Sequence, residues 1–328
     1  MQQSEVTMII VPENQIAGLI TPADCLVAVE GVFASMAKRS AYNFPVIREA
    51  IGHADALYGF KSGFDRDSLA LGLKSGGFWP NNVQKGLANH QSTVFLFDAD
   101  TGRCRAMVGG NLLTALRTAA ASAVSIKYLA RKDAKVLGMI GAGHQSTYQL
   151  RAAVEQRPFE KVLAWNLHPE MLSRLEGVAR ELELPFETVD LDRLGDESDV
   201  IISITSSFAP ILKASQVRPG THLACMGTDT KGKQEMDAEL IAAATVFADE
   251  VAQAITIGEC QHAIEKGLIS RDDIVEIGAV ITGRHPGRSS PEEITLFDGT
   301  GVGLQDLAVA SAAVELALSN GTAIEVDF

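Results

Sequence analysis

The sequence is poor in cysteine and in positive charge. Its four cysteines lie far apart with no C-x-x-C pair among them, which argues against a zinc site and a disulfide framework. Lys and Arg number 28 against 41 Asp and Glu, giving a formal net charge of −13. This balance disfavours nucleic acid and anionic membranes as partners, because both require an excess of Lys and Arg on some face. Any anion that the protein binds must be held by groups that are gathered locally.

Long apolar runs are also missing. The N-terminus, MQQSEVTMIIV, has no basic segment followed by a long apolar stretch, and no run of about eighteen apolar residues occurs elsewhere. We therefore expect no targeting or membrane-spanning segment and, given the cysteine usage, a reducing cytoplasmic location. The 328 residues, 46% hydrophobic and 21% charged, suffice for two domains with substantial cores.

The most informative stretch is VLGMIGAGHQSTYQL, residues 136–150. A short apolar run enters a glycine turn and leaves as a helical pattern, which is how a parallel sheet presents backbone N–H groups to a pyrophosphate. Gly141 permits the tight turn and Gly143 lets the main chain approach the phosphates, whereas Ser146 stands where a third glycine is usual. The context predicts nicotinamide-dinucleotide binding, with a plain turn between strand and helix as the alternative.

The N-terminal third predicts mixed secondary structure. A helix is expected over Ala23–Lys38, with Thr21 as N-cap and Pro22 in the first turn. FLFDADTGRCRAMV predicts a hairpin turning at Ala99–Gly102, so this domain should be rich in antiparallel strands. The alanine-rich stretch Leu112–Ala130 then predicts a long helix.

From residue 136 onward, apolar strands alternate with helical segments such as Glu170–Glu183, the rhythm of a doubly wound sheet. A final helix, Leu304–Ser319, is expected to return to the first domain. We therefore predict an α/β protein with a Rossmann-type dinucleotide-binding domain over 116–304 and a mixed α+β domain over 1–115 with 305–328. The expected strands of the Rossmann-type domain are Val136–Ile140, Val162–Trp165, Val200–Ile204, His222–Met226 and Val246–Ala248.

Asn166 follows the second of these strands, where an acidic residue commonly binds the adenosine ribose. An asparagine can also bond a ribose hydroxyl. A 2′-phosphate would require an adjacent arginine, but Leu167 comes next and the nearest arginine is Arg174 on the following helix. The sequence favours NAD(H) over NADP(H).

Four cations stand near strand ends or in glycine-rich settings and could converge on a carboxylate: Arg48, Lys61, Lys74 and Arg117. For any one of them taken alone, a solvated surface residue is the favoured interpretation. Lys74 departs from that interpretation because apolar residues precede it and SGGFW follows, and Arg117 has mostly apolar or small neighbours. A buried arginine requires an anionic partner.

Asp229 lies in GTDTKGK, residues 227–233, directly after the strand His222–Met226. This position is the carboxyl edge of the predicted sheet, where open α/β proteins bind ligands. Asp229 is therefore a candidate general acid or base. An Asx-turn residue that caps the loop is an equally good interpretation.

Several motifs together resemble the ornithine cyclodeaminase/μ-crystallin family: LKSGGFWPNN, NHQSTVFLFDADTG, NLLTALRTAAAS, VLGMIGAGHQS and the G-T-D-x-x-G-K loop. The resemblance implies a homodimer whose substrate-binding and dimerisation domain combines the N-terminal part with the last helix, and an inserted dinucleotide domain. By this resemblance Arg48, Lys74 and Arg117 would bind the substrate carboxylate and imine region, and Asp229 would be the acid/base residue.

One departure from the family bears on the substrate. Lys61 and Ser62 stand where the family usually has Met-Pro, and an added cation suggests a second substrate carboxylate. Asn89 replaces a small hydroxyl residue of cyclodeaminases, and His90 and Gln91 follow it within reach of a polar substrate.

The pattern is most similar to family members that reduce a dicarboxylic imine with NADH. A cyclodeaminase that recycles NAD, or a crystallin-like protein that binds NAD(P)H and a small ligand without turnover, is the alternative. In the favoured interpretation Lys74 and Asp229 are catalytic, with Arg48, Lys61, Asn89, Gln91 and Arg117 binding the substrate. The residues expected at the cofactor are Thr118, Gly141, Gly143, His144, Gln145, Asn166, Thr205, Met226, Gly227 and Gly303.

Overall fold

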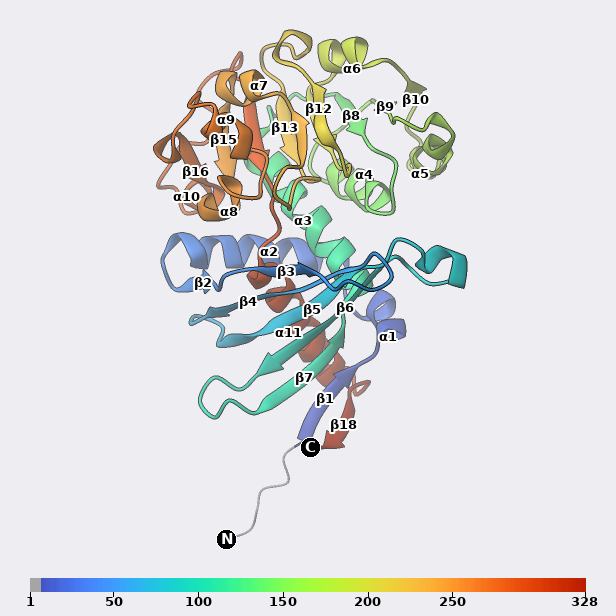
Figure 1. The fold of residues 1–328 in the computed structure, drawn as a ribbon, viewed down its shortest axis with the longest axis vertical. Coiled ribbons are helices and arrows are strands. Elements are labelled where there is room, and N and C mark those ends of the chain that lie inside the picture. Colours follow the sequence, from blue (N-terminus) through green and yellow to red (C-terminus); the bar gives the residue numbers. More distant parts are fainter. Residues whose placement is uncertain (1–6) are drawn as a thin grey trace. The chain divides into compact units, whose positions relative to one another are not determined.

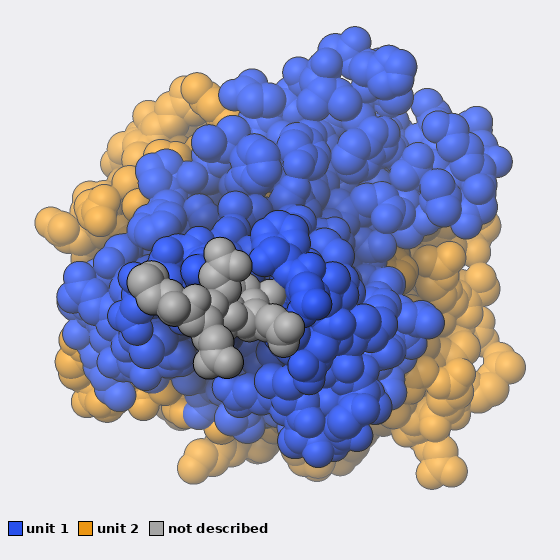
Figure 2. Space-filling model, turned by 90° about the horizontal axis from the view of Figure 1, so that it is seen from below, with its two compact units in different colours: residues 1–117, 302–328 blue, residues 118–301 orange. Residues whose placement is uncertain are grey.

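The computed structural model describes residues 7–328, which form two compact units. The first unit runs to Arg117 and resumes at Val302–Phe328, and the second is Thr118–Gly301 (Figure 2). The sequence places the corresponding changes after residue 115 and before residue 305. Helix α3 (Asn111–Leu129) carries the chain from the first unit into the second.

The first unit is built on one sheet of eight strands (Figure 1). Its order is β18-β1-β7-β6-β5-β4-β2, with β3 also paired to β4. All pairs are antiparallel except β1 with β7. The strands are β1 (Thr7–Val11), β2 (Ala41–Asn43), β3 (Ile47–Ala50), β4 (Leu57–Asp65), β5 (Ala70–Phe78), β6 (His90–Phe97), β7 (Cys104–Gly109) and β18 (Ile324–Asp327).

The helices of this unit are α1 (Glu13–Leu19), α2 (Pro22–Ala37), the short η1 (Asn82–Lys85) and the last helix, α11 (Gly303–Ser319). Helix α2 begins as predicted, because Thr21 and Asp24 form a capping box. Figure 1 shows α11 crossing one face of the sheet. The strands admit this close approach at a glycine: a Cβ on Gly72 would lie 2.9 Å from a methyl group of Leu307.

The second unit is a doubly wound sheet in which all eight strands are parallel. Its order, β10-β9-β8-β11-β13-β17-β15-β16, confirms the predicted α/β class. The strands are β8 (Val136–Ile140), β9 (Lys161–Trp165), β10 (Phe186–Thr188), β11 (Val200–Ser203), β13 (His222–Cys225), β15 (Thr245–Ala248), β16 (Ile274–Glu276) and β17 (Thr295–Asp298). Strands β12 (Phe208–Leu212) and β14 (Gln234–Met236) pair separately.

Short helices connect these strands. They are α4 (Ser146–Val154), α5 (Ser173–Glu181), α6 (Leu191–Glu197), α7 (Ala238–Ala243), α8 (Val251–Ala254), α9 (Gln261–Glu265) and α10 (Ile277–Ile281), with the 3₁₀ turns η2 (Pro169–Leu172), η3 (Ala214–Gln216) and η4 (Arg271–Asp273). The prediction of a single helix over Glu170–Glu183 is wrong for its first turn. Pro169 starts a separate 3₁₀ turn, and the α-helix begins only at Ser173.

Strand β17 is absent from the strands that the sequence predicts. Its four residues, TLFD, are all buried, and it lies between β13 and β15 in the middle of the sheet. The chain reaches it only after β15 and β16, so sequence order gives no indication of its central position.

Within residues 7–328, no single helix combines the length and apolar character needed to cross a membrane. Helices α1 and α2 meet that test only as a pair bent by 94°. Both bury apolar residues, among them Ile16, Val29 and Phe33.

Candidate functional site

The first unit buries three cations on neighbouring elements. Lys61 on β4 lies directly opposite Lys74 on β5, and Arg117 belongs to α3. Their exposed fractions are 9%, 6% and 6%. Like charges in adjacent strands repel, and burial makes each charge costly unless an anion accompanies it.

Asp306 on α11 is that anion. It is wholly buried, and its Oδ1 accepts hydrogen bonds from Lys74 Nζ at 2.9 Å and Arg117 Nε at 3.0 Å. The neighbouring Gln305 Oε1 accepts from Arg117 Nη1 at 2.9 Å. The sequence predicts that a buried Arg117 needs an anionic partner but does not identify Asp306. Lys61 also lowers the pKa of Asp306, so all three basic side chains act on the same carboxylate.

Burial sets the protonation of this cluster. The pKa of Lys74 is lowered to about 7, chiefly by burial and also by the charges of Arg117 and Lys61, against the opposing charge of Asp306. Burial opposes ionisation of Asp306 as well, but Arg117 and Lys74 hold the pKa of that carboxyl below its usual value. Burial and Lys74 lower the pKa of His90 to about 4, so its imidazole is neutral at pH 7. The cluster therefore offers both a cation and an uncharged hydrogen-bonding ring.

The other predicted substrate residues are placed differently. Arg48 is exposed on β3, and its positive charge contributes to the lowered pKa of His90. Asn89 Oδ1 accepts from Val83 N at 3.0 Å, and Gln91 Nε2 donates to Ala88 O at 2.9 Å. Both amides hold the chain segment that precedes β6, so their contact with substrate stays a prediction.

The glycine turn of the second unit has the features of a phosphate-binding loop. Gly141 has a φ of +104°, and a Cβ there would lie 2.6 Å from Ile204 O. Gly143 has no atom within 4 Å of its Cβ position, so it faces open space. Ser146 Oγ donates to Gly143 O at 2.7 Å, which closes the turn at the start of α4 without a third glycine. The loop fits a dinucleotide.

Three further side chains lie at this turn or contact it: Gln145, Asn166 and His144. Gln145 Oε1 is buried with no hydrogen-bond partner among the described residues, and a hydroxyl or amide donor of a dinucleotide would satisfy it. Asn166 Oδ1 accepts from Ala142 N at 3.2 Å, so this residue braces the glycine turn. Its contact with the ribose stays a prediction. His144 is exposed and packs edge-on against Tyr148.

Asp229 forms an ion pair that sequence reasoning missed. Its Oδ1 accepts from Lys233 Nζ at 2.9 Å and from Thr230 Oγ1 at 3.2 Å, and Lys233 also donates to Gly227 O at 3.2 Å. The motif GTDTKGK contains both partners, since Asp229 and Lys233 are only four positions apart, and this short spacing was the available signal for the ion pair. A neighbouring ammonium group favours the charged form of a carboxyl, so the geometry suits Asp229 as a proton acceptor or as one end of a proton-transfer pair.

The remaining predicted cofactor residues are buried or half-buried. Thr205, Met226 and Gly227 lie at or after the carboxyl ends of β11 and β13. Thr118 is buried on α3. Gly303 begins α11, and a Cβ there would lie 2.7 Å from Ser62 N, so close helix–strand packing already requires glycine. Cofactor contacts of these residues stay predictions.

Buried carboxylates also gather at this edge of the second unit, and sequence reasoning missed them. Glu235, Glu259 and Asp298 are at most 1% exposed. Among residues 7–328, no group of three or more His, Cys, Asp or Glu side chains could hold a metal ion. These carboxylates accept hydrogen bonds from backbone N–H groups instead.

The fold and the glycine turn define a dinucleotide-binding α/β protein with a second, α+β unit. The chain belongs to the ornithine cyclodeaminase/mu-crystallin family, whose model matches residues 10–321. It is 68% identical to the iminosuccinate reductase of Paracoccus denitrificans, over 98% of this chain and 100% of that protein.

Solved structures agree with this assignment. The crystal structure of the Paracoccus denitrificans iminosuccinate reductase in complex with NAD⁺ matches with a TM-score of 0.95 at 67% identity, over 98% of this chain and 100% of that one. An archaeal alanine dehydrogenase dimer with bound NAD matches with a TM-score of 0.92 at 31% identity, over 98% of this chain and 99% of that one.

Proposed function

We propose that this protein is an NADH-dependent imine reductase that converts iminosuccinate to aspartate. The observation that carries the proposal is the buried group of Lys61, Lys74 and Arg117 beside Asp306, because basic side chains gathered on neighbouring elements suit a substrate with two carboxylates. The similarity to an iminosuccinate reductase over nearly the whole chain supports the same substrate.

The reaction adds two electrons and two hydrogens across the C=N bond. NADH, when bound, supplies hydride to the carbon, and a proton reaches the nitrogen, giving an amine and NAD⁺. Arg117 and Arg48 bind the α-carboxylate, with Arg117 already oriented by Asp306 and Gln305. Lys61 binds the β-carboxylate. Lys74, whose pKa burial lowers to about 7, polarises the imine region in its protonated form.

In the second unit Asp229 governs the proton at the substrate nitrogen or at a water molecule, and Lys233 Nζ, 2.9 Å from Asp229 Oδ1, holds that carboxylate in place. The glycine turn supplies backbone N–H groups for the pyrophosphate, with Gly143 open to the ligand. Thr118, His144, Gln145, Asn166, Thr205, Met226, Gly227 and Gly303 complete the proposed cofactor-binding set.

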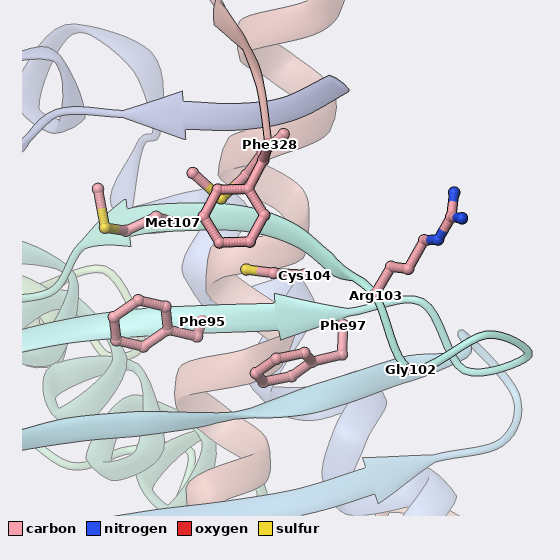
Figure 3. A pocket seen from close by; sticks show the side chains of 8 residues that line it. Phe95, Phe97, Gly102, Arg103, Cys104, Met107 and Phe328 are labelled. Carbon is pink, nitrogen blue, oxygen red and sulfur yellow. The ribbon is translucent and has the colours of Figure 1, made fainter. Parts of the chain in front are cut away.

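The proposed enzyme is a cytoplasmic homodimer. One face of the first unit's sheet buries Val94 and Leu96. On the opposite face, Phe95, Phe97 and Met107 line an apolar hollow (Figure 3). An apolar sheet face of this kind fits a second copy of the chain, and a related archaeal enzyme is described as a dimer. Light scattering should give twice the chain mass, and Phe97→Glu should lower it toward one chain. A wild-type monomer would contradict the dimer.

The test of function is product formation. Oxaloacetate and ammonia, which generate iminosuccinate in solution, should support NADH oxidation with one aspartate formed per NADH. Ammonia release from ornithine without net NADH change would instead identify a cyclodeaminase. Retention of NADH with no turnover of any imino acid would identify a binding protein.

A further inference from the structure

Glu235, in the middle of β14, is a wholly buried carboxylate with three hydrogen-bond donors. Its Oε2 accepts from Ser203 Oγ at 2.7 Å and Gly227 N at 3.0 Å, and its Oε1 accepts from Thr205 N at 2.6 Å. These donors lie at the end of β11 and in the loops that follow β11 and β13. One side chain therefore joins two neighbouring loops at the carboxyl edge of the sheet.

The contact is too close to admit another side chain. A Cβ on Gly227 would lie 2.5 Å from Thr205 O and 2.6 Å from the carboxyl carbon of Glu235. Glycine at position 227 thus lets the loop backbone reach the carboxylate. The positions of Thr205, Gly227 and Glu235 are fixed together.

Glu259 in turn binds the backbone of β14 at Glu235. Its Oε1 accepts from Glu235 N at 2.8 Å and Met236 N at 2.6 Å, and Thr228 Oγ1 donates to its Oε2. Burial and the neighbouring charge of Glu235 raise the pKa of Glu259 to about 8. Burial raises the pKa of Glu235 as well, but its three donors favour the charged form.

We propose that Glu235 is a positioning residue for the cofactor, whose buried carboxylate holds the loops at Thr205 and Gly227 in the conformation that binds the dinucleotide. The inference rests on the proposed binding of NADH at this edge. A buried charge is costly, and it persists where fixed hydrogen bonds compensate it. Here they fix the two loops where an open α/β sheet binds its ligand.

The test compares two buried carboxylates at opposite edges of one sheet. Asp199, 5% exposed at the amino edge, accepts from Lys135 N at 2.7 Å and Val136 N at 2.9 Å and pairs with Arg131 and Arg218, so it joins the starts of β8 and β11, whereas Glu235 joins the loops that follow β11 and β13. Glu235→Gln places an amide N–H against a donor, and Asp199→Asn does the same at the far edge. Both variants should melt at a lower temperature.

Binding of NADH, measured by its fluorescence well below the melting temperature, should separate the two variants. We expect the Kd for NADH to rise about tenfold or more in Glu235→Gln and to stay within about threefold in Asp199→Asn. The KM for NADH should rise with Kd, whereas kcat at saturating NADH should change little. A smaller fraction of folded protein would by itself lower the apparent kcat and leave the Kd for NADH unchanged. Wild-type affinity in folded Glu235→Gln would overturn the proposal.

Ser203→Ala supplies a second test that leaves both glutamates in place. Removal of one donor should raise the Kd for NADH about threefold and speed amide hydrogen exchange in residues 203–207 and 226–229 of the cofactor-free protein. If Glu235→Gln does not fold, unchanged affinity and exchange in Ser203→Ala overturn the proposal. Failure of the wild-type protein to bind NADH would instead overturn the proposed function, and this inference with it.

Discussion

The two units bury charge of opposite sign. The first surrounds one carboxylate, Asp306, with Lys61, Lys74 and Arg117. The second buries carboxylates at the carboxyl edge of its sheet, and their donors are backbone N–H groups and hydroxyls. In a chain with a net charge of −13, the buried Lys and Arg side chains of the described residues thus lie where a carboxylate substrate is proposed. The proposed phosphate site depends on backbone groups.

The largest expected effect on stability follows from removing the charge of Asp306, the carboxylate that the buried cations of the first unit share. Asp306→Asn leaves Lys74 and Arg117 without their buried counter-charge and should lower the free energy of unfolding by about 3–5 kcal/mol. Trp79 belongs to the first unit and Trp165 to the second, so denaturation followed in a Trp165→Phe background reports the first unit. Asp100→Asn, at an exposed position of the first unit, is the control. A loss below about 1 kcal/mol would mean that Asp306 is not needed to compensate the cations.

The next effect tests the acid/base role in the second unit. Asp229→Asn should lower kcat about a hundredfold or more and leave the Kd for NADH nearly unchanged, because the side chain acts on a proton and not on the cofactor. Steady-state kinetics and NADH titration separate the two quantities. Lys233→Met, which removes only the partner of Asp229, should cost less. Retention of most turnover in Asp229→Asn would make that residue a loop cap.

A smaller effect should distinguish substrates. Lys61→Met removes a charge-assisted contact worth about 1.5–3 kcal/mol, a loss of roughly ten- to a hundredfold in kcat/KM with a dicarboxylic imine. A monocarboxylic imine should lose little, because it has no second carboxylate to contact Lys61. Kinetics with oxaloacetate plus ammonia and with pyruvate plus ammonia measure both. Equal losses would assign Lys61 to the fold or to the α-carboxylate.

A further prediction is a pH dependence of opposite sign in the two units. The pKa of Lys74 is lowered from 10.5 to about 7, so the unfolded chain binds more protons between these values and the first unit should gain stability as pH rises through them. The pKa of Glu259 is raised from 4.5 to about 8, so the second unit should lose stability as pH rises over that range. Denaturation followed at Trp79 and Trp165 separates the units. Lys74→Met and Glu259→Gln should each flatten one slope, and an unchanged slope would refute the corresponding assignment.

Local features of the fold could be predicted from the sequence, whereas distant partners could not. The glycine turn at Gly141 and the helix cap at Thr21 depend on residues that are close in the chain. Arg117 signals its need for an anion through its apolar neighbours, but Asp306 lies 189 residues away on the last helix. Glu235 gives no local signal, because it belongs to a three-residue strand whose burial depends on the loops around it.

The most direct test of the central claim is the ratio of two specificity constants in the wild-type enzyme. NADH oxidation is measured with oxaloacetate plus ammonia and with pyruvate plus ammonia, under identical conditions. Three buried cations beside one carboxylate predict a preference of about tenfold or more for the dicarboxylic imine, the scale of one charge-assisted contact. Equal specificity constants, or a preference for the imine from pyruvate, would contradict the account.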